Sequence, residues 1–156
     1  MPEVHVSLGR MGGVYAALHS SHVFADHVIQ SGNDAEDKAG DGWAARVACA
    51  RHVGELTAFQ IVALAAAVYA TGERLNPRRV LAGLAVNAAT HYLLDRRPFA
   101  RELNYKLGKK AFYDDFKVQR DGWVDPYGPG SGPYALDQAW HVGILAITAT
   151  IIAGKD

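Results

Sequence analysis

Histidine and aspartate stand four residues apart three times in this chain, each time in or beside an apolar stretch. The three pairs are His22/Asp26, His91/Asp95 and Asp137/His141. A spacing of four puts both side chains on one face of a helix, about 40° apart around the axis. Seven histidines and eleven aspartates among 156 residues give roughly one such pair by chance. We therefore expect helices that turn imidazoles and carboxylates toward a shared interior.

The apolar surroundings of the pairs indicate that they are buried. The second pair follows the apolar run 80–86, and the third precedes the apolar run 142–147. A solvated helical ion pair would lie on a charged face instead. Because a buried carboxylate requires a cation, and because imidazole with carboxylate is a usual ligand set for zinc, manganese or iron, the pattern predicts a metal site.

Four imidazoles and three carboxylates make up the predicted ligand set. They are His22, Asp26, His52, His91, Asp95, Asp137 and His141. Of these, the carboxylates are also the predicted catalytic residues. One tetrahedral ion takes at most four ligands, so seven suit two ions that share a carboxylate and leave room for water and substrate. A single ion is the alternative, and zinc or manganese is the expected metal.

Further polar residues are expected to support the ligands. Gln30, Asn87 and Gln138 stand near them on the same helices and suit hydrogen bonds to them. His27 is rotated by about 100° from Asp26 in a regular helix, so we do not expect it in the site.

Such a metal centre favours hydrolysis. A bound divalent ion lowers the pKa of its water toward about 7, so hydroxide is present at neutral pH. Lys38, Arg96 and Arg97 are the expected substrate-binding cations. The sequence thus favours a metal-dependent phosphohydrolase or phosphodiesterase acting on a small phosphorylated molecule such as a nucleotide. Three alternatives stay open: a purely structural polar network, a non-catalytic protein that binds a small ligand, and a membrane-associated protein with a structural polar core.

Several other classes lack their signatures. The chain contains no His-Glu-x-x-His, no Glu-x-x-His pair, no adjacent His-Asp doublet and no nucleotide-binding glycine pattern. The formal net charge is zero, which gives no signal for nucleic acid. The single cysteine, Cys49, excludes an internal disulfide and a Cys-rich zinc finger. Oligomeric state is not predicted.

We expect an all-α fold, a single-domain bundle over residues 1–156 with about five main helices around the His/Asp residues. The expected helices are 13–30, 43–53, 55–70, 77–95 and 134–153, with short helices at 100–107 and 110–118. Segments 31–42 and 121–133 are expected loops, and no strand is expected.

Two stretches, 56–70 and 139–153, resemble membrane spans but are shorter than the roughly 20 residues that a span needs. The N-terminal ten residues lack a secretion-signal pattern. We therefore expect a cytoplasmic protein whose central helices are buried on all sides, with membrane attachment as the alternative.

The pattern as a whole resembles that of a known family. Its elements are His22-x-x-x-Asp26-x-x-x-Gln30, Lys38, His52, His91-x-x-x-Asp95 and Asp137-Gln138-x-x-His141. They are similar to those of an uncharacterised bacterial and phage family of small helical proteins, known as a domain of unknown function, whose members are often labelled membrane proteins. The resemblance runs from His22 to the last helix and implies that these positions form one site. A looser similarity, to all-helical zinc-dependent phospholipase C and nuclease-like enzymes, implies only hydrolytic chemistry.

Overall fold

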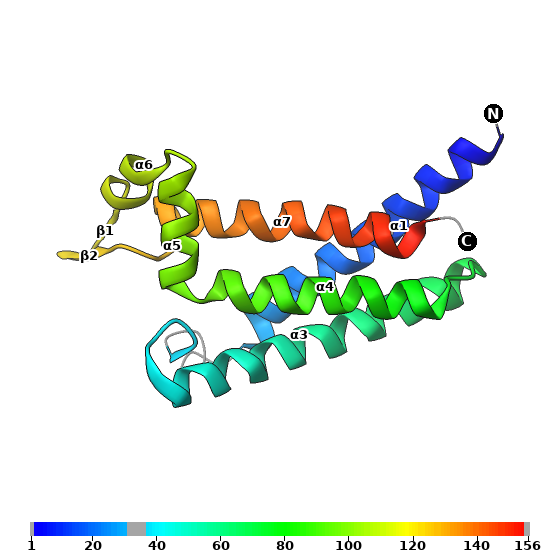
Figure 1. Ribbon diagram of the computed structural model, residues 1–156, viewed down its shortest axis with the longest axis horizontal. Coiled ribbons are helices and arrows are strands. Elements are labelled where there is room, and N and C mark those ends of the chain that lie inside the picture. The colour runs from blue at the N-terminus through cyan, green and yellow to red at the C-terminus, as the bar shows by residue number, and fades with distance from the viewer. Residues whose placement is uncertain (1, 31–36, 155–156) are drawn as a thin grey trace.

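The computed structural model describes residues 2–30 and 37–154, with side chains described from residue 8 onward. It confirms the predicted all-α, single-domain helical bundle (Figure 1). The bundle is built from four long helices: α1 (Pro2–Phe24), α3 (Gly42–Thr71), α4 (Pro77–Asp95) and α7 (Gly132–Ala153). Helix α4 packs on α7 and α3, and α1 packs on α7 and α3, so the four helices enclose one interior.

Helix α3 corrects the predicted arrangement of two shorter helices. One uninterrupted helix of 30 residues stands where helices 43–53 and 55–70 were expected. The expected break falls at Gly54, and a methyl group added there would have no other atom of the described residues within 4 Å. A glycine inside a helix costs only about 1 kcal/mol relative to alanine, which a long packed helix tolerates. The helix ends at Gly72, whose φ of 71° is left-handed.

Side-chain caps set where α4 and α7 begin. The Asn76 side chain accepts a hydrogen bond of 2.9 Å from the backbone N–H of Arg78, and Pro77 occupies the first turn. The Ser131 hydroxyl accepts one of 3.3 Å from the backbone N–H of Tyr134. The expected boundaries 77–95 and 134–153 are thus nearly correct.

The first helix begins earlier than expected and ends differently. It starts at Pro2 rather than at residue 13, and it passes directly into a π-helical turn, η1 (Ala25–Ile29). The N–H of Gln30 donates to the carbonyl of Ala25 at 2.9 Å, five residues back. This wider turn changes the direction of the side chains that follow it.

Small elements cover one end of the bundle. They are α5 (Arg97–Lys106), α6 (Lys110–Asp115), β1 (Val118–Arg120) and β2 (Trp123–Asp125). The expectation that no strand occurs is wrong, because β1 and β2 form an antiparallel hairpin. Its turn, Asp121-Gly122, has φ values of 43° and 87°, as a two-residue hairpin turn requires.

The hydrophobic core lies toward the other end. Its fully buried members are Val14, Leu18, Leu64, Leu84, Leu145, Ala149, Ile152 and Ala153. At Gly83, α4 and α7 approach so closely that an added methyl group would lie 2.5 Å from Cγ1 of Ile152.

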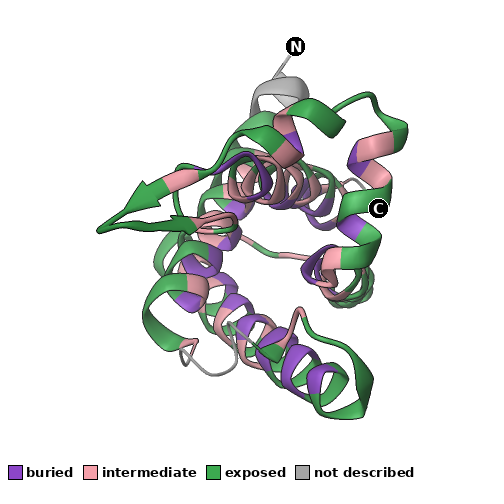
Figure 2. Ribbon diagram, turned by 90° about the vertical axis from the view of Figure 1, so that its left-hand side faces the viewer, coloured by how far each residue is buried: buried purple, intermediate pink, exposed green. Residues whose placement is uncertain are grey.

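The long helices are buried on one side only. Helices α3 and α7 are long and apolar enough to cross a membrane, yet only 22% and 28% of their most apolar 18-residue windows are buried. Figure 2 shows the buried positions on the inner faces and the exposed positions outside. The expectation that the central helices are buried on all sides is therefore wrong.

Candidate metal centre

The seven predicted ligands come together at one end of the bundle. Asp26 lies in η1, and the others come from the long helices: His22 from α1, His52 from α3, His91 and Asp95 from α4, and Asp137 and His141 from α7. We call these seven side chains the His/Asp cluster. The four imidazoles are 1–3% exposed, so no solvent surrounds them.

The four imidazole rings contact one another. The Nε2 atoms of His52 and His91 are 3.0 Å apart. The ring centroids of His91 and His141 are separated by 4.2 Å, and those of His22 and His141 by 5.1 Å. The two Nε2 atoms of His52 and His91 are close enough to need a proton or a cation between them.

The carboxylates lie between the rings. Asp26 is 3.2 Å from Nε2 of His52 and 3.5 Å from Nε2 of His22. Asp95 has a carboxylate oxygen 3.3 Å from Nε2 of His91 and 3.5 Å from Nε2 of His52.

Asp137 completes the cluster from α7. One of its oxygens is 3.4 Å from Nδ1 of His141, while Nε2 of the same ring is 3.9 Å from Asp95. The Asp137 side chain is 32% exposed, against 3% for Asp95, so it forms the open edge of the cluster.

The spacing of these atoms fits metal coordination. Donors about 2.1 Å from one tetrahedral ion are about 3.4 Å from each other. Three groups of three residues each place their donor atoms within 4.8 Å of one another. The groups share members, so ions bound at neighbouring groups would share ligands. The groups are His22/Asp26/His91, His52/His91/Asp95 and Asp95/Asp137/His141.

Several of the buried donors lack a hydrogen bond among the described residues. Both ring nitrogens of His22 and of His141 are in this state. One oxygen of Asp26 and one of Asp95 also lack a hydrogen bond, although the first has an ion-pair contact of 3.2 Å to His52 and the second one of 3.0 Å to Lys38. Burying polar atoms without partners is costly, and a cation coordinated by them removes that cost. The donor set therefore fits one or two divalent transition metals.

Lys38 reaches the cluster from the segment before α3. Its Nζ is 3.0 Å from an oxygen of Asp95. Burial acts to lower the pKa of this ammonium, but the carboxylates of Asp95 and Asp26 outweigh burial and raise the pKa above its ordinary value. When the four imidazoles are neutral, as metal ligation requires, the three carboxylates and the Lys38 ammonium leave two negative charges, which suits a divalent cation.

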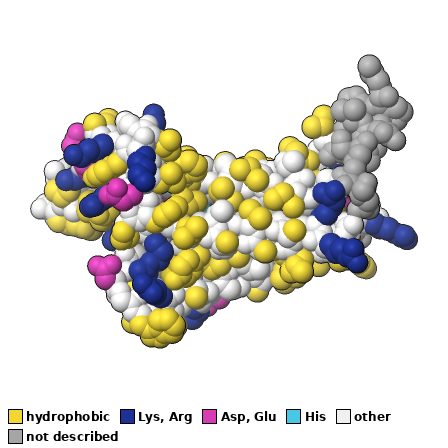
Figure 3. Space-filling view, in the orientation of Figure 1, with side chains coloured by type: hydrophobic (Ala, Val, Ile, Leu, Met, Phe, Trp, Pro, Cys, Tyr) yellow, Lys and Arg dark blue, Asp and Glu magenta, His cyan; other side chains and the backbone are white. Residues whose placement is uncertain are grey.

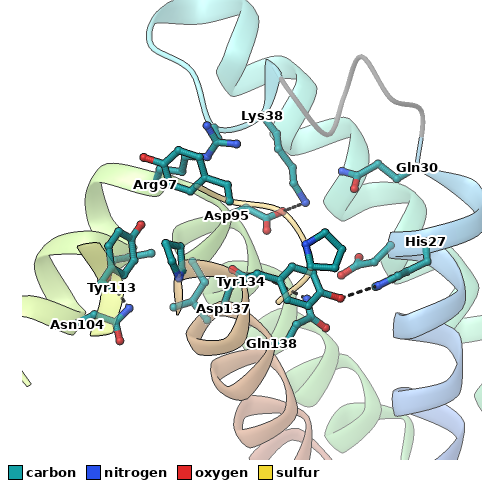
Figure 4. A pocket seen from close by; sticks show the side chains of 17 residues that line it. His27, Gln30, Lys38, Asp95, Arg97, Asn104, Tyr113, Tyr134, Asp137 and Gln138 are labelled. Atoms are coloured by element: carbon teal, nitrogen blue, oxygen red, sulfur yellow. Dashed lines mark hydrogen bonds and ion pairs between the residues drawn. The ribbon is translucent and has the colours of Figure 1, made fainter. Parts of the chain in front are cut away.

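A pocket of about 300 Å³ opens beside the cluster (Figure 4). Asp26, Asp95 and Asp137 line its inner part. The remaining polar and aromatic side chains of its wall are His27, Gln30, Lys38, Arg97, Asn104, Tyr113, Tyr127, Tyr134 and Gln138. This volume is at the lower end of the range typical of small-molecule sites.

Of the two predicted arginines, one lines the pocket and the other does not. The guanidinium of Arg97 lies 4.0 Å from the centre of the Tyr127 ring and lines the pocket. Arg96 instead donates to the backbone carbonyl of Lys38 at 3.0 Å and is not among the pocket-lining residues. It therefore holds the segment that carries Lys38 rather than facing a substrate.

The predicted supporting residues occupy different places. Gln138 and Gln30 line the pocket, and Gln138 donates to Asp137 at 3.3 Å. Asn87 is buried and donates to Gln60 at 2.9 Å, which joins α4 to α3.

A histidine and a tyrosine of the pocket were missed from the sequence. His27 Nε2 is 3.1 Å from the Tyr134 hydroxyl, as the dashed line in Figure 4 marks. His27 was left out because a regular helix would turn it away, whereas it lies in the wide turn η1. Tyr134 is three residues before Asp137 on α7, and this one-turn spacing was the available signal.

None of the comparisons, with protein-family models, curated proteins and solved structures, gives a match to this chain. The resemblance to the helical family of unknown function, and the looser one to phospholipase C-type enzymes, stay predictions.

Proposed function

We propose that this protein is a metal-dependent phosphohydrolase or phosphodiesterase that acts on a small phosphorylated molecule such as a nucleotide. The observation that carries the proposal is a set of seven His and Asp side chains, six of them nearly inaccessible to solvent, beside a pocket that also has two cations. The cofactor is one or two divalent ions, with zinc or manganese the metals that this donor set suits.

Each group has a role in such a reaction. A divalent ion held there would lower the pKa of its water so that hydroxide forms near neutral pH, and would offset charge on the phosphoryl oxygens. Asp137, the most exposed of the three carboxylates, accepts the proton of the attacking water. The remaining cluster residues hold the ion.

The pocket cations bind the substrate. Lys38 and Arg97 offer N–H groups to phosphate oxygens, and charge-assisted hydrogen bonds of this kind are strong. The Tyr127 ring holds the Arg97 guanidinium in a stacked position, which limits its freedom.

The proposal is tested on the purified full chain by elemental analysis and by hydrolysis of a panel of phosphate mono- and diesters, including nucleotides. We expect bound zinc or manganese and metal-dependent turnover. His91→Ala and Asp137→Ala should abolish turnover while the helical circular dichroism persists.

The matched control is His19→Ala, which removes a histidine from α1 that stacks on Tyr15 outside the cluster. It should keep both metal and activity. Turnover that survives His91→Ala and Asp137→Ala would reject the proposal. Retention of an intact nucleotide that is unaffected by chelator would instead mean a non-catalytic binding protein.

A further inference from the structure

Four stretches without Asp, Glu, Lys or Arg lie next to one another in the bundle. They are residues 11–25, 56–72, 80–94 and 138–154, one from each long helix and the turn that follows it. At 15 to 17 residues each, they are about 23–26 Å long. We call the outer surface of these stretches the apolar belt.

Large apolar side chains on the belt are exposed on every one of the four helices. They are Val23, Phe24, Ile61, Val62, Tyr69, Leu81, Val86, Leu93, Val142 and Ile147. Leu81 is 72% exposed and Val62 is 65% exposed, although they belong to different helices. Because the belt extends around all four helices, one folded partner or a second copy of the chain would cover only part of it.

Serine and threonine hydroxyls on the surface of the belt bond to the backbone of their own helix. The exposed hydroxyls of Ser20, Thr71 and Thr150 each donate to a backbone carbonyl four residues earlier, at 2.7–2.9 Å. The half-buried hydroxyls of Thr57 and Thr90 do the same. A hydroxyl that bonds its own helix carries no unsatisfied polar group into an apolar surrounding.

Charged residues lie at both edges of the belt. Figure 3 shows Lys and Arg gathered at the two ends of the bundle, with hydrophobic side chains between them. One edge holds Arg10, Glu73, Arg78 and Arg79, of which Arg10 and Glu73 pair at 3.2 Å. The other edge lies at the level of Asp26, Glu55, Asp95 and Asp137, three of which belong to the His/Asp cluster.

We propose that the bundle spans a lipid bilayer, with the apolar belt facing the acyl chains. The belt is slightly shorter than a typical hydrocarbon core of about 30 Å, and the long arginine side chains at its edges can extend toward the headgroups. The His/Asp cluster and its pocket then lie at one membrane surface, and ligands enter from the water or headgroups on that side. This replaces the expectation of a cytoplasmic protein and does not depend on hydrolytic activity.

The first test follows the full chain through cell fractionation. We expect the wild type in membranes, resistant to alkaline carbonate, and monodisperse only in detergent. Val62→Lys and Val86→Lys, both near the middle of their stretches, should each reduce the membrane-bound fraction by about tenfold or more, because a lysine in mid-bilayer is strongly disfavoured. Leu107→Lys changes an exposed leucine outside the belt and should leave this fraction unchanged.

A second test does not depend on the lysine variants folding. Val62→Cys and Lys110→Cys are each made in a Cys49→Ala background. Membranes that contain either variant are opened and treated with a charged maleimide. Lys110→Cys should be labelled at once, and Val62→Cys only after denaturation in SDS. Recovery of the wild type as a monodisperse species without detergent, or equal labelling of the two cysteines, would overturn the proposal.

Discussion

Lys38 is held beside Asp95 by charge rather than by its place in a helix. The two carboxylates that raise its pKa keep it protonated through the neutral range, so a cation is always present where the pocket meets the cluster. It competes with a metal ion for one oxygen of Asp95 but leaves the other donors free.

Replacing Lys38 by methionine separates substrate binding from metal binding. Lys38→Met keeps the length of the side chain and removes the ammonium. We expect kcat/KM for phosphate esters to fall about a hundredfold, as for loss of one preorganised donor, while the bound metal per chain is unchanged. Loss of the metal together with the activity would mean that Lys38 holds the cluster and does not contact substrate.

The residues of the His/Asp cluster could be predicted from the sequence because, in a regular helix, the spacing between two residues determines whether their side chains point the same way. His91 and Asp95 are four residues apart, and α4 has no irregular turn between them. Neighbours on irregular segments could not be placed in this way. Placing His27 required knowledge of η1, and placing Tyr127 required knowledge that the segment after β2 brings its ring to Arg97 at the start of α5.

At the level of helices, the close approach of α4 to α7 depends on Gly83. We expect Gly83→Ala to lower the free energy of unfolding by about 1–2 kcal/mol, because the new methyl group meets Ile152 in a packed core. The matched variant Gly143→Ala, where no other described atom lies within 4 Å, should gain about 0.5–1 kcal/mol from helix propensity. Denaturant titration measures both, and equal stability of the two variants would contradict this packing.

The helix caps allow a similar comparison. Asn76→Ala removes the capping acceptor of α4 and should cost about 1 kcal/mol of unfolding free energy. Asp41 occupies the same position before α3 but makes no capping hydrogen bond among the described residues. Asp41→Ala is therefore expected to be nearly neutral in the same unfolding measurement, and a loss equal to that of Asn76→Ala would contradict the role of the cap.

How well helix boundaries could be predicted depended on the strength of these local signals. Asn76-Pro77 combines a cap with a first-turn proline, and α4 begins where expected. A helix break is predicted at Gly54, but the packing of α3 against α1 and α4 outweighs the modest cost of a glycine. The hairpin was missed although its Asp121-Gly122 pair is a recognised turn signal, because its strands are only three residues long.

On the scale of the whole molecule, a metal ion bound as proposed would cross-link four helices that are distant in sequence. Removing it with a chelator should lower the thermal midpoint of the purified protein by about 10 °C, and added zinc or manganese should restore it. A ligand at 1,000 times its Kd contributes about 4 kcal/mol, and each kcal/mol shifts the midpoint of a chain this size by about 2–4 °C.

Two variants test whether this change in the thermal midpoint on chelation comes from the His/Asp cluster. His91→Ala should unfold at the lower temperature with or without chelator, and His19→Ala should respond as the wild type does. If the thermal midpoint of the wild type is unchanged by the chelator, shared protons and not an ion hold the imidazoles together.

The wide turn at Ala25–Ile29 makes the chemistry sensitive to chain length. Removing a single residue there would restore the regular pitch and rotate the residues just after it by about a quarter of a circle. Pocket-lining side chains of this turn and its end, His27 and Gln30, would then point away from the pocket. A one-residue deletion at this place should therefore be far more harmful than one at the tip of the β-hairpin.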